Sequence, residues 1–161
     1  ADGTDGALMS VPAASLALIR ALARRLVSGG GALLVVDYGH VRPGFGDTLQ
    51  ALAGHRFADP LAEPGEADLT HHVDFAALAQ AARAEGAAIH GPVDQGDFLA
   101  ALGLGARAER LRARANPAQV TAIDAAVTRL TDPGRGGMGR LFKVLAVSGP
   151  SLGPLPGFPA P

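Results

Sequence analysis

The feature that most constrains the fold is the run from Ala32 to Val36, ALLVV, which is apolar throughout and shows no alternation with polar residues. A strand with one solvated face alternates, whereas a strand buried on both faces is a continuous hydrophobic run, as in parallel sheets covered by helices. Gly29-Gly30-Gly31 precede the run and Asp37-Tyr38-Gly39-His40 follow it. We therefore predict a buried strand of an α/β sheet over 32–36, followed directly by a cluster of polar side chains.

The flanking segments predict helices and two more strands. Apolar residues at helical spacing predict a helix that begins near Ser10 and Pro12 and ends at the glycine triplet. Asp74 precedes a second helix, which ends at Gly86. Apolar runs over 87–93 and 141–147 predict strands, and the stretch 97–130 is mainly helical with a restart at Asn116-Pro117. Strand, helix and strand in this order indicate two parallel strands with a right-handed crossover.

Two segments carry no periodic pattern. Residues 38 to about 73 are rich in Pro and Gly, and so long a connection is expected to be functional or disordered. Residues 149–161, a Pro/Gly-rich tail, are expected to be extended or disordered, which leaves 1–148 as the folded part. Only three strands are convincing, yet the strand over 32–36 needs a neighbour on each side. We therefore expect the chain to be a piece of a larger α/β domain.

Composition excludes several classes of function. The 161 residues are 48% hydrophobic and 18% charged, which fits a packed domain, and the net charge of −1 gives no electrostatic reason to expect nucleic acid as a partner. The absence of cysteine excludes disulfides and a thiol nucleophile. No apolar run approaches the roughly 20 residues of a membrane helix, so membrane insertion is not expected. No signal peptide is visible, and the Ala-, Gly- and Arg-rich composition favours the cytoplasm of a bacterium with a GC-rich genome.

The polar residues after the strands lie where α/β sheets bind ligands. Ligands of open α/β sheets sit outside the carboxyl ends of the strands. Asp37-Tyr38-Gly39-His40 and Asp94-Gln95-Gly96 are expected at the same edge, where the long connection also starts and ends. Simpler readings remain open: Asp37 as a turn residue with Gly39 at positive φ, Tyr38 as core filling and Asp74 as a helix cap. The arginines from Arg107 to Arg114 are predicted to form a solvated helix face.

Two motifs that would indicate a function are not supported by the sequence, and no metal site is predicted. GRGGMG (134–139) matches a dinucleotide loop letter for letter, but it precedes a strand instead of following one, so we interpret it as a flexible turn. The nucleophile elbow of α/β hydrolases, Gly-x-Ser-x-Gly, is absent. His71 and His72 are adjacent and diverge, and no histidine pair has the spacing of metal ligands.

Five segments resemble the MidA-type methyltransferases in order and spacing. They are DYGH (37–40), GDTLQALAGH (46–55), PGEADLTHHVDFAALAQAARAEGA (64–87), GPVDQGDFLAALGL (91–104) and MGRLFKVLAV (138–147). The resemblance implies the carboxy-terminal part of a Rossmann-like class I methyltransferase sheet. It implies two parallel strands, with a final antiparallel strand between them. It also implies S-adenosyl-L-methionine as cofactor and, as substrate, a protein such as a subunit of respiratory complex I, whose arginine is methylated.

The resemblance also implies roles for the polar residues. The glycine-rich turn and the ribose-binding acid of the family have no counterpart here, so cofactor contacts are expected mainly outside this chain. A guanidinium acceptor favours nearby carboxylates. The residues expected to be catalytic are Asp37, Tyr38 and His40. Those expected to bind substrate are Asp47, Asp68, Thr70, His72, Asp74, Gln95 and Phe98.

The leading hypothesis is a protein methyltransferase whose cofactor half is missing from this chain. The rival is a non-catalytic interaction module for assembly on the same fold, and a small-molecule hydrolase is disfavoured because no nucleophile is found. A eukaryotic source would place the protein in mitochondria. The oligomeric state is not predictable from the sequence.

Overall fold

The computed structural model describes residues 10–42, 44, 48–134 and 137–159. The helices and strands, in chain order, are α1 (Ala13–Gly29), β1 (Ala32–His40), β2 (Gln50–Ala53), β3 (Arg56–Ala58), β4 (Asp68–Thr70), β5 (Val73–Asp74), α2 (Phe75–Ala84), β6 (Ala88–Asp94), α3 (Gln95–Ala101), α4 (Leu104–Arg112), α5 (Pro117–Thr131) and β7 (Phe142–Ser148). No helix among the described residues is both long and apolar enough to cross a membrane.

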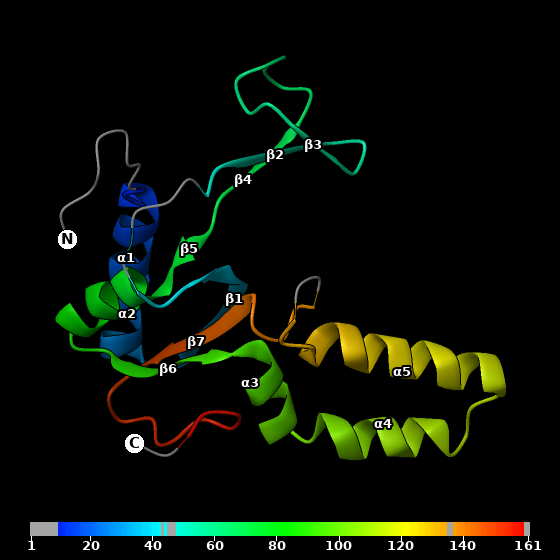
Figure 1. Ribbon diagram of the computed structural model, residues 1–161. Coiled ribbons are helices and arrows are strands. Elements are labelled where there is room, and N and C mark those ends of the chain that lie inside the picture. The colour runs from blue at the N-terminus through cyan, green and yellow to red at the C-terminus, as the bar shows by residue number, and fades with distance from the viewer. Residues whose placement is uncertain (1–9, 43, 45–47, 135–136, 160–161) are drawn as a thin grey trace.

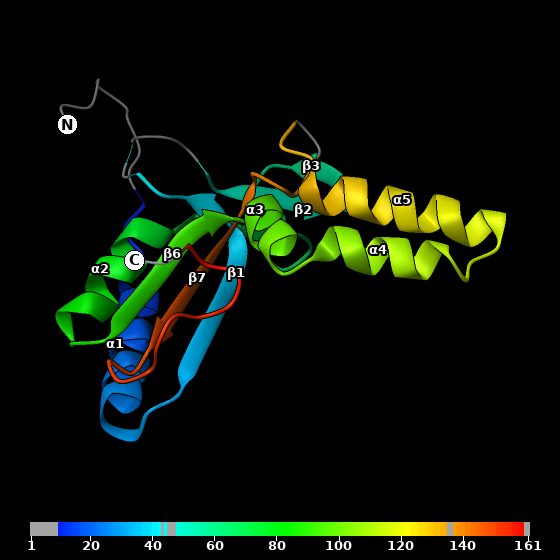
Figure 2. The ribbon, with the colours of Figure 1, turned by 90° about the horizontal axis from the view of Figure 1, so that it is seen from below.

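The main sheet has the order β5-β1-β7-β6 (Figures 1 and 2). Strand β7 runs antiparallel to β1 on one side and to β6 on the other, so β1 and β6 are parallel to each other without touching. This confirms the predicted α/β class and the antiparallel last strand between two parallel ones. Strand β5 adds only two residue pairs to β1, at Gly39 and His40.

The core lies between this sheet and the helices α1 and α2, which cover one face (Figure 2). Ile19 and Ala23 from α1 and Phe75 from α2 pack against Leu145 and Val147 of β7, and all five are at most 3% exposed. The side chains of Leu33 and Val35 on β1 join this core. Because neighbouring strand residues point to opposite faces, Leu34 and Val36 lie on the other face and are 52% and 45% exposed.

Helix α1 begins one residue later than its sequence signal indicates. Pro12 occupies the capping position without a side-chain hydrogen bond, and Ser10 lies two positions before it, outside the helix. The predicted stop is confirmed, because the helix ends at Gly29 and Gly30 has a positive φ of 74°. The helical restart is confirmed too: Asn116 and Gln119 form a reciprocal capping box at the start of α5.

The long connection has structure of its own, so of the two expectations, functional or disordered, the second is wrong for its described strands. Strands β3, β2 and β4 form a small antiparallel sheet that projects from the body as an arm (Figure 1). Gly54 and His55 have φ of 55° and 62° and make the two-residue turn between β2 and β3. Two positive φ angles are what a tight hairpin turn requires. Helices α4 and α5 form a second arm, which projects from the body next to α3 (Figures 1 and 2).

Two glycine-rich segments are also more ordered than expected. In GRGGMG, Gly137 and Gly139 are buried, and a Cβ on Gly139 would overlap the carbonyl of Thr131 at the end of α5. The described part of this motif is therefore packed rather than a flexible turn, while residues 135 and 136 lie outside the described residues. The described part of the tail has no helix or strand, but Phe158 packs against the rings of Phe98 and His90. It crosses the sheet face opposite α1 and α2 (Figure 2).

Candidate functional site

The polar end of β1 belongs to the strand itself. The prediction that the strand ends at Val36 was short by four residues, because Asp37 and Tyr38 continue the pairing with β7, opposite Lys143 and Phe142. Gly39 and His40 then pair with Val73 and Asp74 of β5. The four residues therefore hold fixed positions at the carboxyl edge of the sheet, and the long connection starts and ends there as predicted.

Gly39 is a glycine because β5 approaches it closely. A Cβ at this position would overlap the carbonyl oxygen of Val73 and would lie 3.0 Å from the ring of Phe75. Its φ is not positive, so the reading of Asp37 and Gly39 as a turn is wrong. The half-buried Asp37 accepts a hydrogen bond from the backbone N–H of Tyr38 at 2.8 Å through Oδ1.

An aromatic cluster lies at the same end of β1. The ring of Tyr38 meets the ring of Phe142 edge-on, with centroids 5.6 Å apart and planes at 85°. It meets the imidazole of His72 in the same way, at 5.7 Å and 67°. Tyr38 is thus held from two sides, and its half-buried ring forms a wall at the edge of the sheet.

A cavity of about 300 Å³ opens at the junction of β1 and β5. It is lined by Ser10, Val11, Pro12, His40, Leu49, His71, His72 and Asp74. The buried Nδ1 atom of His40 has no hydrogen-bond partner within the described part of the protein. Such an atom loses its hydration without compensation, so a ligand that donates a hydrogen bond to it would be favoured.

Burial lowers the pKa of His72 below its ordinary value of 6.5, and the neighbouring His40 and His71 lower this pKa further. His72 is therefore neutral near pH 7 and able to accept a proton. Asp74 accepts a hydrogen bond from the N–H of Ala77 at 2.9 Å, which confirms it as the cap of α2. The cavity thus joins imidazoles to a carboxylate that is fixed by a helix.

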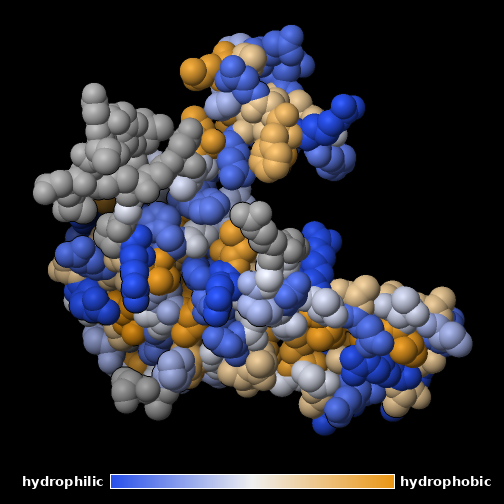
Figure 3. All heavy atoms as spheres, viewed as in Figure 1, coloured by the Kyte–Doolittle hydropathy of each residue, from blue (hydrophilic) through white to orange (hydrophobic). Residues whose placement is uncertain are grey.

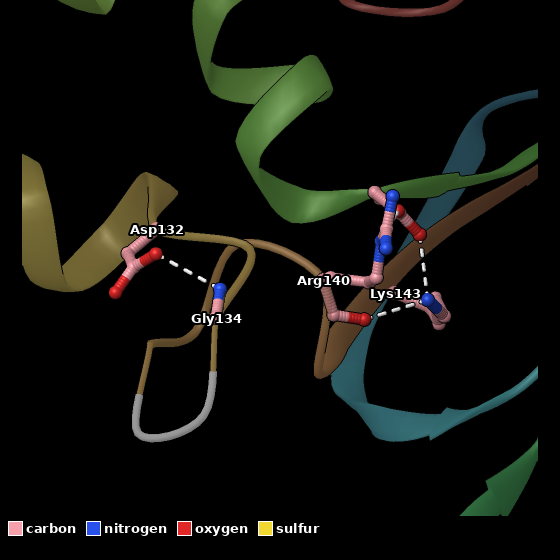
Figure 4. A network of polar contacts seen from close by, with 5 residues as sticks. Asp132, Gly134, Arg140 and Lys143 are labelled. Carbon is pink, nitrogen blue, oxygen red and sulfur yellow. Dashed lines mark hydrogen bonds and ion pairs between the residues drawn. The ribbon is translucent and has the colours of Figure 1, made fainter.

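A charged network occupies the same edge of the sheet, on β6 and β7 (Figure 4). Lys143, 9% exposed, donates from Nζ to Asp94 Oδ1 and to the carbonyl oxygen of Arg140, both at 2.6 Å. The Nε atom of Arg140 lies 3.7 Å from the other oxygen of Asp94. Lys143 stands opposite Asp37 on β1 and opposite Asp94 on β6, so the three residues form a row across the sheet.

Lys143 and Arg140 were not among the site residues predicted from the sequence. A signal was present, because Lys143 is the only lysine of the chain and lies in an otherwise apolar strand. A lysine there must be paired when the strand is buried. Its partner could not be identified, since Asp94 is 49 positions away and the pairing depends on the register of β6 and β7.

The structure brings together half of the predicted site residues. Those at the edge of β1 and β5 are Asp37, Tyr38, His40, His72 and Asp74. Thr70 and Asp68 lie on β4 in the projecting small sheet, with Asp68 exposed, and Asp47 lies outside the described residues. The buried Gln95 donates from its side-chain nitrogen to the carbonyl of Leu130 at 3.0 Å. Phe98 packs against Phe158. Gln95 and Phe98 therefore both serve the packing of α3.

Within the described residues, no group of three or more His, Asp or Glu side chains could hold a metal ion. The β1 edge carries a carboxylate, an aromatic wall and imidazoles. Such a set suits a planar cation: a carboxylate accepts hydrogen bonds from a guanidinium, and an aromatic ring attracts positive charge to its face.

Comparison with known proteins identifies the family of the chain. Residues 1–93, more than half of the chain, match the family described as "Putative S-adenosyl-L-methionine-dependent methyltransferase". The mitochondrial protein arginine methyltransferase NDUFAF7 homolog of Drosophila melanogaster is 44% identical over 131 residues, which are 78% of this chain and 28% of that protein. The human protein arginine methyltransferase NDUFAF7 is 38% identical over 64% of this chain and 23% of its own length.

Solved structures show the same fold. A Burkholderia thailandensis protein crystallised with S-adenosyl-homocysteine is 30% identical, with a TM-score of 0.75 over 91% of this chain and 38% of the solved chain. A second crystal structure of a protein from that organism also gives a TM-score of 0.75, at 31% identity over 89% of this chain and 39% of the other. The chain therefore spans well under half of these relatives. The predicted resemblance is confirmed, and the chain belongs to the MidA-type family of S-adenosyl-L-methionine-dependent methyltransferases.

Proposed function

We propose that the intact protein methylates arginine in a protein substrate and that this chain supplies the acceptor side of the active site. One observation carries the proposal: Asp37, Tyr38, His40 and His72 gather at the carboxyl edge of β1, in a chain whose relatives are named protein arginine methyltransferases. We extend the proposal to a subunit of respiratory complex I as substrate, as the motif resemblance implies.

Asp37 is the residue we assign to the substrate guanidinium. Its Oδ1 is engaged by the N–H of Tyr38, which fixes the carboxylate, and Oδ2 has no partner in the part of the chain that the structure describes. A guanidinium that donates to Oδ2 makes a charge-assisted hydrogen bond there. Asp37 lies opposite Lys143 on β7, and Lys143 is itself held by Asp94. These contacts hold this edge of the sheet in place.

The imidazoles are the groups we assign to proton transfer. A guanidinium that gains a methyl group must also release a proton, and a neutral imidazole is a suitable acceptor near pH 7. The lowered pKa of His72 keeps it neutral, and the Nδ1 atom of His40 has no hydrogen-bond partner among the described residues. The direct neighbour of His40 across β1 and β5 is Asp74, which is held at the start of α2.

The described residues do not by themselves form a cradle for the cofactor. Two strands of the main sheet lead directly into helices, β5 into α2 and β6 into α3, and backbone amides at both starts are engaged. Asp74 accepts from Ala77, and the N–H of Gly96 donates to the carbonyl of Gly139 at 2.9 Å. Neither start offers a glycine-rich turn with free amides for the cofactor's carboxylate. The family's cofactor is therefore assigned to residues of the intact protein outside this chain.

The open edge of β1 supports this assignment. Within the described residues, the strand from Ala32 to Tyr38 pairs with β7 on one side only, since β5 reaches no further than Gly39 and His40. An unpaired, apolar edge with the exposed side chains of Leu34 and Val36 is unfavourable in water. We propose that a strand of the remaining protein pairs with this edge and places the cofactor beside Asp37.

Methyl transfer by the intact protein tests the proposal. The assay follows tritiated methyl groups from S-adenosylmethionine into purified complex I subunits, for wild type and for Asp37→Asn. We expect kcat to fall about 100-fold or more in Asp37→Asn, with an unchanged melting temperature, because the amide keeps the shape but loses the charge. Asp97→Asn, an exposed change on α3, is the matched control and should retain full activity. Normal turnover in Asp37→Asn would remove Asp37 from the site. Cofactor binding without any methyl transfer would favour the non-catalytic assembly module.

A further inference from the structure

The α4–α5 arm presents a surface that the fold does not use. The two helices pack mainly against each other and against α3 at their base, and they project from the body in both views (Figures 1 and 2). Helix α5 has no buried residue along its 15 residues, and α4 has one, Ala108. A helix pair of this length usually hides an apolar face. Here that face is only partly covered.

An open groove of about 710 Å³ runs between the two helices near their connection. Its lining residues are Arg107, Arg110, Leu111, Ala113, Arg114, Ala115, Gln119, Ala122 and Ile123. The apolar part comes from Leu111, which is 41% exposed, and from Ala115, Ala122 and Ile123. In Figure 3 hydrophobic residues (orange) and strongly hydrophilic ones (blue) stand side by side on this arm.

The charge at the groove is of one sign. Arg107, Arg110 and Arg114 are exposed, and no carboxylate is among the described lining residues. These three arginines form no ion pair within the described residues, whereas Arg112 is bound by Asp124 at 2.6 Å. Arg107 and Arg110 are three positions apart and are therefore neighbours on the surface of α4. These three arginines form a positive rim along the groove, and no carboxylate of the described residues is paired with them.

We propose that the groove binds an acidic amphipathic helix of a partner protein. Leucine-like side chains of that helix would cover Leu111 and Ile123, and its flanking carboxylates would pair with the arginines, as in other helix-in-groove complexes. A nucleic acid fits less well, because the lining has no aromatic side chain on which a base could stack. Because the chain as a whole has a net charge of −1, the attraction for an acidic partner comes from these arginines and not from the overall charge. This inference does not depend on the reaction assigned above.

The test uses the intact protein and a fluorescein-labelled synthetic helix of about five turns. Its leucines recur at i, i+3, i+4 and i+7, and glutamates flank them. We expect fluorescence anisotropy to show binding that weakens as salt rises from about 0.05 M to about 0.5 M. The triple variant Arg107→Gln/Arg110→Gln/Arg114→Gln removes the positive charge of the rim and should raise Kd about tenfold or more. Ala122→Glu, an exposed position of α5, should also weaken binding, because it adds bulk and negative charge inside the groove.

The matched control is Arg20→Gln/Arg25→Gln/Arg83→Gln, which removes the same charge from exposed positions of α1 and α2 and should leave Kd unchanged. A peptide with lysine in place of glutamate should not bind. Three results would overturn the proposal: no binding of the acidic peptide by the folded intact protein, equal loss in both triple variants, or equal affinity for a single-stranded oligonucleotide. The first would mean that another part of the protein covers the groove.

Discussion

Gly39 of β1 lies against Val73 of β5 so closely that no side chain fits between them. This single contact joins the two ends of the segment that carries the small sheet. It also places His40 directly across from Asp74, the residue that begins α2. The cavity with His40 and His72 therefore exists because one position of β1 lacks a Cβ.

Gly39→Ala should destabilise the protein by about 2–3 kcal/mol, because the added methyl group would overlap the Val73 carbonyl and press on Phe75. Urea unfolding measures this change. Gly44→Ala is the control, since a Cβ at that position meets nothing within 4 Å. Equal stability of both variants would show that β5 is held loosely and that the cavity does not depend on this contact.

Much of the main sheet was predictable from local pattern. The uninterrupted run ALLVV identified β1, and Asp74 with Gly86 delimited α2, because caps and hydrophobic runs are short-range signals. The place of β7 between β1 and β6 came only from the family resemblance. Strand order depends on contacts between distant residues, such as Ala32 with Ser148 and Asp94 with Lys143, and hydropathy does not encode those.

The small sheet was missed because its strands have only three or four residues each. No periodicity can be recognised over so few positions. The signal that was available is Gly54-His55 between two short apolar runs, which is the spacing of a tight hairpin. Lys143 was missed for a related reason: its need for a partner is visible in the sequence, but the identity of that partner requires the register.

The Lys143–Asp94 pair should contribute strongly to stability. Lys143→Met leaves Asp94 with only the more distant Arg140, and we expect a loss of about 2–3 kcal/mol. A double-mutant cycle with Asp94→Asn should give a coupling energy above about 1 kcal/mol. The control cycle uses Arg112 and Asp124, an exposed pair, for which the coupling should stay below about 1 kcal/mol. Similar couplings in the two cycles would mean that the burial of Lys143 adds nothing.

His72 should make stability depend on pH. Its pKa in the folded protein is lower than in the unfolded chain, so below about pH 6.5 the unfolded chain binds the proton first. The contribution of the neutral imidazole is therefore present above pH 6.5 and is lost as pH falls toward the folded pKa. We expect the melting temperature of wild type to exceed that of His72→Gln by more at pH 7.5 than at pH 5.5. A constant difference would contradict the lowered pKa, and an NMR titration of the His72 ring measures it directly.

The C-terminal segment should be part of the folded unit despite its composition. The ring of Phe158 lies 5.2 Å from that of Phe98 and 6.0 Å from that of His90, measured between centroids. A Cβ on the preceding Gly157 would overlap the Phe98 ring, so the approach needs a glycine. Phe158→Ala should therefore cost about 1–3 kcal/mol in urea unfolding, because it removes a half-buried ring from the face opposite α1 and α2. Leu152→Ala, a 41% exposed change in the same segment, should cost less than about 1 kcal/mol. If both variants were as stable as wild type, the segment would be a free end, as its proline and glycine content alone indicates.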